Sequence, residues 1–101
     1  MSFALKAFFS KTGKARFISH LDLVRLFQRA SRRASVPVLI TQGFSPRLKI
    51  SISRALKLGV ESAAEEALFT MSAPVEPEVF VSAMNKKLPY GVSIIKAEKA
   101  E

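Results

Sequence analysis

The spacing of apolar residues switches between two periods along this chain, and the order of the switches limits the folds open to it. Over residues 3–9 apolar side chains occupy every second position, which is the period of a strand with one buried face. Over residues 23–34 they recur at intervals of three and four, which predicts an amphipathic helix ending before Pro37. Ser19 stands where the N-cap of that helix belongs, and Asp22 stands where a capping-box partner belongs.

The remaining segments repeat the alternation between strand and helix. Leu48, Ile50 and Ile52 alternate with polar residues and predict a strand, and the β-branched run 36–41 predicts either an added edge strand or a lead-in to it. Further along, the pattern predicts a strand at 65–71, a helix that begins near Pro74 and Pro77 and ends before Pro89, and a strand at 92–97.

This order is that of a ferredoxin-like α+β sandwich, in which an antiparallel sheet of four or five strands carries two helices on one face. We predict a single domain over residues 1–101. The predicted core consists of Phe3, Leu5, Phe9, Leu23, Phe27, Leu48, Ile50, Ile52, Phe80, Met84 and Ile94.

Charge is distributed unevenly along the chain. The sequence has 16 Lys and Arg against 8 Asp and Glu, a net charge of +8. Residues 1–60 hold twelve of the basic residues and only one acid, Asp22, whereas residues 61–101 are net acidic. We therefore expect a basic surface formed by the first half, which suits nucleic acid, anionic lipid or an acidic protein, or which serves only solubility.

Several kinds of chemistry are excluded by composition. The chain has no Cys and a single His, so it can build no disulfide, iron–sulfur cluster or thiolate zinc site of its own. We predict no metal and no cofactor. The first ten residues lack the charge pattern of a secretion signal, and no window holds the ~18 apolar residues that span a bilayer. We expect a soluble, cytoplasmic protein without membrane contact.

A basic turn precedes the first predicted helix. Helix N-termini present free backbone N–H groups and the positive end of the dipole, so anions bind there readily. We predict either a phosphate or carboxylate site or a solvated basic turn. The residues of this turn are Lys11, Gly13, Lys14, Arg16, Ser19 and His20. Because His20 and Asp22 are two positions apart, they do not face each other on a helix, and we predict no catalytic pair.

A second candidate surface is the sheet face that the helices leave open. If Leu48 and Ile50 point to the core, Arg47 and Lys49 point to this open face. By the same parity Lys6 and Phe8 should join them. An aromatic among basic residues on an open sheet is a common way of binding single-stranded RNA, by stacking and phosphate contacts.

The turn Gln42–Pro46 places Phe44 at a hairpin tip. A Phe at such a tip is either part of a recognition loop or folds back on the sheet edge. We leave both alternatives open and count Gln42 and Phe44 among the candidate partner-binding residues.

Three segments carry a resemblance to a known family. They are Lys11–Leu23, Gln42–Ser51 and Leu58–Ser62. In combination they resemble the uncharacterised radical-SAM-linked domain family, whose members are accessory domains fused to radical SAM proteins or encoded beside them. Family members are longer, which would make this chain a short form or the N-terminal portion of a longer architecture. The resemblance implies a radical SAM protein as a partner, and the missing Cys means that this chain cannot hold that partner's cluster.

Three functions follow from these features. The leading hypothesis is a non-catalytic accessory module of a radical-SAM-associated system that recognises RNA or a ribonucleoprotein through its basic surface. The second is a docking module for the radical SAM partner. The third is a small phosphate-ligand binder or enzyme that uses the Lys11–His20 turn, which the lack of a complete catalytic constellation disfavours.

Overall fold

A computed structural model describes residues 3–52 and 62–100 of the chain. The elements in chain order are β1 (Phe3–Lys11), a short 3-10 helix η1 (Gly13–Phe17), α1 (His20–Arg33), β2 (Ile50–Ile52), β3 (Ser62–Met71), α2 (Pro77–Asn85) and β4 (Val92–Ala100). The Leu58–Ser62 segment of the resemblance falls mostly outside the described residues.

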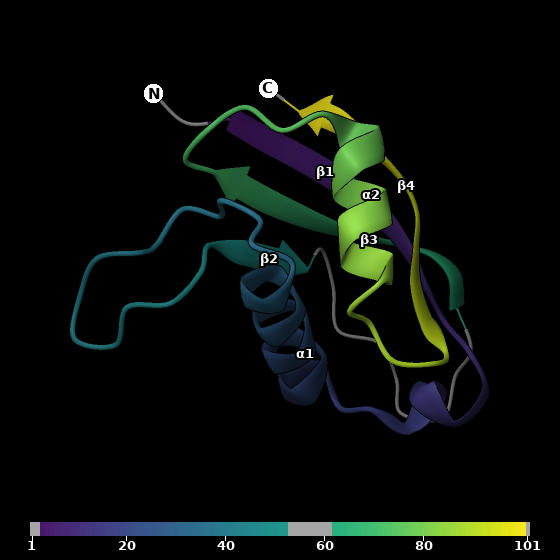
Figure 1. The fold of residues 1–101 in the computed structure, drawn as a ribbon. Helices are drawn as coiled ribbons and strands as arrows, with labels where there is room; N and C mark the ends of the chain where they lie inside the picture. The colour runs from purple at the N-terminus through teal and green to yellow at the C-terminus, as the bar shows by residue number, and fades with distance from the viewer. Residues whose placement is uncertain (1–2, 53–61, 101) are drawn as a thin grey trace.

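The four strands form one antiparallel sheet in the order β2-β3-β1-β4. Both helices lie on the same side of this sheet (Figure 1). The two central strands, β1 and β3, are thus not consecutive in sequence, because α1 and the edge strand β2 come between them. After β3 the chain passes through α2 to the other edge strand, β4. The predicted α+β ferredoxin-like sandwich is confirmed, with four strands.

The core lies between the sheet and the two helices and is built around a chain of aromatic rings. Phe9 of β1 meets Phe27 of α1 with ring centroids 5.0 Å apart, and Phe27 meets Phe69 of β3 at 5.7 Å. Phe69 meets Phe80 of α2 at 4.9 Å. All three pairs are edge-on, the geometry that the quadrupoles of aromatic rings favour. This row of aromatic rings therefore holds both helices against the same face of the sheet.

Most of the predicted core residues are buried, and the exceptions lie at the sheet margins. Phe3 is 38% exposed at the start of β1, and Ile50 and Ile52 are only partly buried because β2 is an edge strand. Sequence reasoning missed Phe69 and Met71, which are fully buried in β3.

The two helices begin where their sequences indicate. Ser19 is the N-cap of α1, and the helix passes into a C-cap at Ala34, followed by Ser35 with a positive φ of 56°. Pro77 occupies the first turn of α2, where its missing N–H costs nothing.

The segment 36–41 forms no strand of its own. It makes one bridge to the sheet, from Val38 to Met71, and one to Leu48. Three backbone bonds close a triangle at the sheet edge: Leu39 N–H donates to Thr70, Thr70 N–H to Lys49, and Lys49 N–H to Leu39. From this triangle residues 39–49 leave the sheet as a hairpin, which we call the edge hairpin (Figure 1).

Candidate functional site

The open face of the sheet carries charges of both signs. Phe8 stands opposite Glu66 and Lys96, and Lys6 stands opposite Glu98. The Nζ atom of Lys6 lies 3.8 Å from Oε1 of Glu66, and Nζ of Lys96 lies 4.8 Å from the centroid of the half-buried Phe8 ring. The basic residues on this face are thus matched by acidic ones, and the aromatic ring already has a cation over it.

Arg47 does not join Lys6 and Phe8 on that face, and this part of the prediction is wrong. The sheet-paired part of the second strand begins only at Ile50, so Arg47 belongs to the edge hairpin. There its carbonyl accepts from Thr41 N–H at 2.7 Å, and its own N–H donates to Oγ1 of Thr41 at 3.2 Å. Lys49 lies at the base of the hairpin, where it leaves the sheet, and its side chain is exposed.

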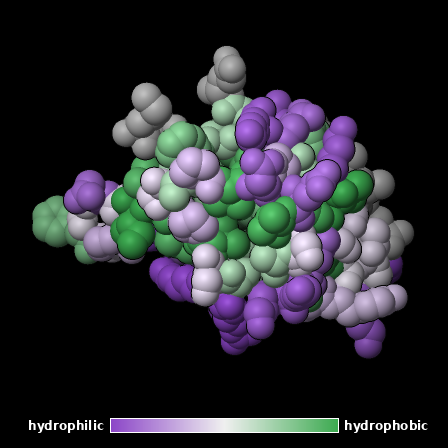
Figure 2. All heavy atoms as spheres, turned by 45° about the horizontal axis from the view of Figure 1, so that its top comes forward, coloured by the Kyte–Doolittle hydropathy of each residue, from purple (hydrophilic) through white to green (hydrophobic). Residues whose placement is uncertain are grey.

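The edge hairpin stands away from the body of the molecule, as Figure 2 shows. Its whole tip, residues 42–47, is exposed, and Phe44 is fully so. Ile40 on the outgoing arm is 57% exposed. Of the two alternatives for Phe44, the structure therefore shows the one in which the ring points outward. Gly43 has a φ of 128°, a backbone conformation that favours glycine, so it allows the turn.

Six of the twelve basic residues of the first half are exposed on α1 and this hairpin. Between residues 23 and 60 the sequence contains no Asp or Glu. α1 contacts β2, the strand that follows the hairpin, so the helix and the hairpin base are neighbours. We call this region the basic surface, and its exposed members are Arg25, Arg29, Arg32, Arg33, Arg47 and Lys49.

Lys11 of the predicted anion turn is buried in the core, which contradicts the expectation of a solvent-facing lysine. It follows Leu5, Ala7 and Phe9 on the inward side of β1, and strand parity carries its side chain inward too. Its Nζ donates to the carbonyl of Ile18 at 2.8 Å, which ties the turn before α1 to the sheet. Burial lowers the pKa of Lys11 from its ordinary value, while the negative charge of Glu65 acts in the opposite direction.

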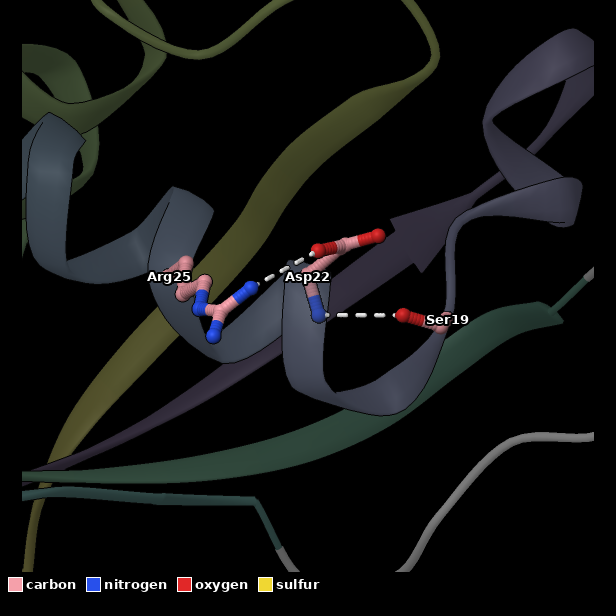
Figure 3. A network of polar contacts seen from close by, with 3 residues as sticks. All are labelled: Ser19, Asp22 and Arg25. Atoms are coloured by element: carbon pink, nitrogen blue, oxygen red, sulfur yellow. Dashed lines mark hydrogen bonds and ion pairs between the residues drawn. The ribbon is translucent and has the colours of Figure 1, made fainter.

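The N-terminus of α1 is already capped by the chain itself. The N–H of Asp22 donates to Oγ of Ser19 at 3.1 Å, which confirms the predicted N-cap (Figure 3). The Asp22 carboxylate, rather than reaching back to Ser19, faces Arg25 one turn on, at 3.5 Å (Figure 3). A negative side chain in the first turn also satisfies the helix dipole. The free N–H groups and the positive dipole end, which attract an anion to a helix start, are therefore partly satisfied by Ser19 and Asp22.

The other residues of the predicted turn are spread over η1 and the start of α1. Lys14 is exposed, and Gly13 has a positive φ of 60°. The guanidinium of Arg16 lies 4.7 Å from the ring centroid of its neighbour Phe17. The Nδ1 atom of His20 is enclosed and has no hydrogen-bond partner within the described part of the chain. Anion binding by these residues stays a prediction.

Comparison with known proteins assigns the chain to a family. Residues 5–101 match the profile of a family described as uncharacterised proteins conserved in bacteria (DUF2344). The chain belongs to this family. A search of curated proteins finds no match. The uncharacterised-domain part of the resemblance is thus confirmed, whereas the family description contains no link to radical SAM proteins. No helix within the described residues of this DUF2344 domain is long and apolar enough to cross a membrane.

Sequence reasoning missed one grouping of charged residues in this DUF2344 domain. Arg29 and Arg33 of α1 and Lys87, which follows α2, line the same hollow. The spacing of the two arginines is visible in the sequence as i and i+4. The position of Lys87 near the two arginines depends on how the two helices pack, so no local sequence pattern predicts it.

Proposed function

We propose that this domain is a non-catalytic accessory module that binds RNA through the edge hairpin and the exposed side of α1. One observation carries the proposal. Phe44 is fully exposed at the tip of a hairpin that also presents Arg47 and Lys49, in a stretch of sequence without a single acid.

The physical argument joins an aromatic ring with nearby cations. An exposed ring offers a platform on which a base stacks, worth about 1–3 kcal/mol per base, and it does so for any base. Basic side chains displace counterions from the phosphates, which supplies most of the sequence-independent affinity. A single exposed Phe is ordinary on a protein surface. Its combination with a protruding, acid-free basic surface is what favours RNA.

The open sheet face, where the sequence places this function, is a poorer candidate. Lys6 is near Glu66, and Lys96 lies over Phe8, so neither the cation nor the ring is free of partners there. The proposal therefore places RNA binding on the edge hairpin, at the β2 edge of the sheet.

The resemblance to radical-SAM-linked domains extends the proposal to a partner. We propose that the module serves a radical SAM protein, fused or encoded nearby, by presenting it with an RNA or ribonucleoprotein substrate in the cytoplasm. The exposed Phe44 also supports a second candidate, in which the hairpin docks on that partner protein and contacts no RNA.

Fluorescence anisotropy with short single-stranded and hairpin RNAs separates the two candidates. We expect Phe44→Ala and Arg47→Gln each to weaken RNA binding. The matched control is Phe8→Ala, which removes a Phe from the open face and should leave the affinity unchanged. Negligible RNA binding by the wild type at physiological salt would contradict the proposal. Loss of radical SAM partner binding in Phe44→Ala would then establish docking.

A further inference from the structure

A small hollow lies between α1 and the segment that follows α2. Its volume is about 270 Å³, and its lining is Leu26, Arg29, Ala30, Arg33, Lys87 and Pro89. Three of its lining residues are apolar, and all the charged ones are basic. Ligand pockets for drug-sized molecules begin at roughly 300 Å³, so this hollow suits a small group.

The three cations of this hollow form no ion pair within the described residues. Arg29 and Arg33 are one helical turn apart and so lie on one side of α1. Lys87 is held in place by its backbone N–H, which donates to the Met84 carbonyl at 2.9 Å. Among the described residues the acids Glu66, Asp22 and Glu76 pair with other cations, and no carboxylate lines the hollow.

Helix dipoles account for only part of this arrangement. Arg33 belongs to the last turn of α1, and Lys87 follows the last turn of α2, where the negative dipole ends favour cations. Arg29 lies before the last turn of α1 and gains little from the dipole. Three like charges around one hollow repel one another, and a bound anion removes that repulsion.

We propose that this hollow binds a phosphate group, held by the guanidinium groups of Arg29 and Arg33 and the ammonium group of Lys87. Guanidinium matches two phosphate oxygens at once, and an ammonium adds a compact third charge. The site shares Arg29 and Arg33 with the basic surface and so deepens the proposed function, but it includes no residue of the edge hairpin. Its phosphate has two possible sources, a nucleic-acid strand or a free phosphorylated small molecule.

The test is an NMR titration of the full chain with inorganic phosphate, at ionic strength held constant with chloride. We expect saturable shifts of the Arg29 and Arg33 side-chain Nε–H signals and of the Lys87 amide. In the Arg29→Gln and Arg33→Gln variants the dissociation constant should rise about tenfold or more, since each loses a charge-assisted bond. The control is Lys99→Gln, at a lysine near Glu76 and outside the hollow, which should bind phosphate as the wild type does. Shifts that do not saturate, or that persist unchanged in Arg29→Gln and Lys87→Gln, would overturn the site.

Further arms identify the source of the phosphate. A 5′-phosphorylated oligonucleotide, its 5′-hydroxyl counterpart and a nucleoside monophosphate are titrated in the same way. Tighter binding of both oligonucleotides assigns the hollow to strand phosphates, and tighter binding of the 5′-phosphorylated one alone assigns it to a strand end. Binding of the monophosphate as tight as either oligonucleotide assigns it to a small ligand. Phe44→Ala should leave the titration with inorganic phosphate unchanged, so failure of RNA binding at the hairpin and failure of this site can be told apart.

Discussion

The ammonium group of Lys96 lies 4.8 Å from the centroid of the Phe8 ring, across the pairing of β4 with β1. A cation over a ring at this distance is attracted by the negative face of the π system. Together with the Lys6–Glu66 contact, it gives the aromatic ring and Lys6 of the open sheet face partners within the sheet. This relationship moves the proposed RNA contact away from the sheet and onto the edge hairpin.

Replacing Phe8 should therefore affect stability and not RNA affinity. Phe8 is half-buried, so Phe8→Ala is expected to lower the free energy of unfolding by about 1–2 kcal/mol, below the 3–5 kcal/mol typical of a fully buried Phe. Phe27→Ala, at a fully buried ring of the core chain, should cost the larger amount. Urea denaturation measures both. An RNA affinity that falls tenfold in Phe8→Ala would restore the open face as the binding surface.

The cap of α1 makes a measurable contribution to stability. Ser19→Ala removes the acceptor of the Asp22 N–H bond, and we expect a loss of about 1 kcal/mol in the free energy of unfolding. Ser45→Ala, at the exposed hairpin tip, is the matched control and should stay within about 0.5 kcal/mol of the wild type. Equal stabilities of the two variants would show that the cap bond is not formed in solution.

Buried Lys11 gives stability a distinct pH dependence. Burial lowers its pKa in the folded state from the ordinary value of 10.5, against the opposing effect of Glu65. Between the folded and unfolded pKa values the unfolded chain binds more protons, so stability rises with pH in that window.

Lys11→Met removes this titration. The free energy of unfolding of the wild type, minus that of Lys11→Met, should increase as the pH is raised towards 10.5 and then level off. Urea denaturation across an alkaline pH series measures the difference. A difference that is flat or that falls with pH would show that Lys11 is not buried in solution.

The fold could be predicted because its local signals agree with its tertiary packing. Alternation over residues 3–9, the cap at Ser19 and Pro77 in the first turn of α2 all specify elements that the structure contains. The Ala and Glu residues of β3 suit a helix as well as a strand. Pairing along β1 determines its conformation, and that pairing is invisible in a local window.

The candidate site was harder to predict because it depends on where strands end. Parity placed Lys6 and Phe8 correctly on the open face, but it failed for Arg47, since the triangle at Leu39, Lys49 and Thr70 takes the hairpin out of the sheet. The same parity, carried two residues further along β1, would have placed Lys11 in the core. The positive charge of Lys11 suggested a solvent-facing turn instead. Its hydrogen bond to the Ile18 carbonyl explains how the buried ammonium group is accommodated.

The salt dependence of RNA binding tests the central claim most directly. Each phosphate contact contributes about −0.7 to the slope of log affinity against log salt for a single strand. The double variant Arg47→Gln, Lys49→Gln should flatten the wild-type slope by roughly 1.4, the sum for two such contacts. Lys6→Gln, at a lysine near Glu66 on the open face, should leave the slope unchanged. Binding at the edge hairpin would be contradicted if the double variant leaves the wild-type slope unchanged and Lys6→Gln flattens it.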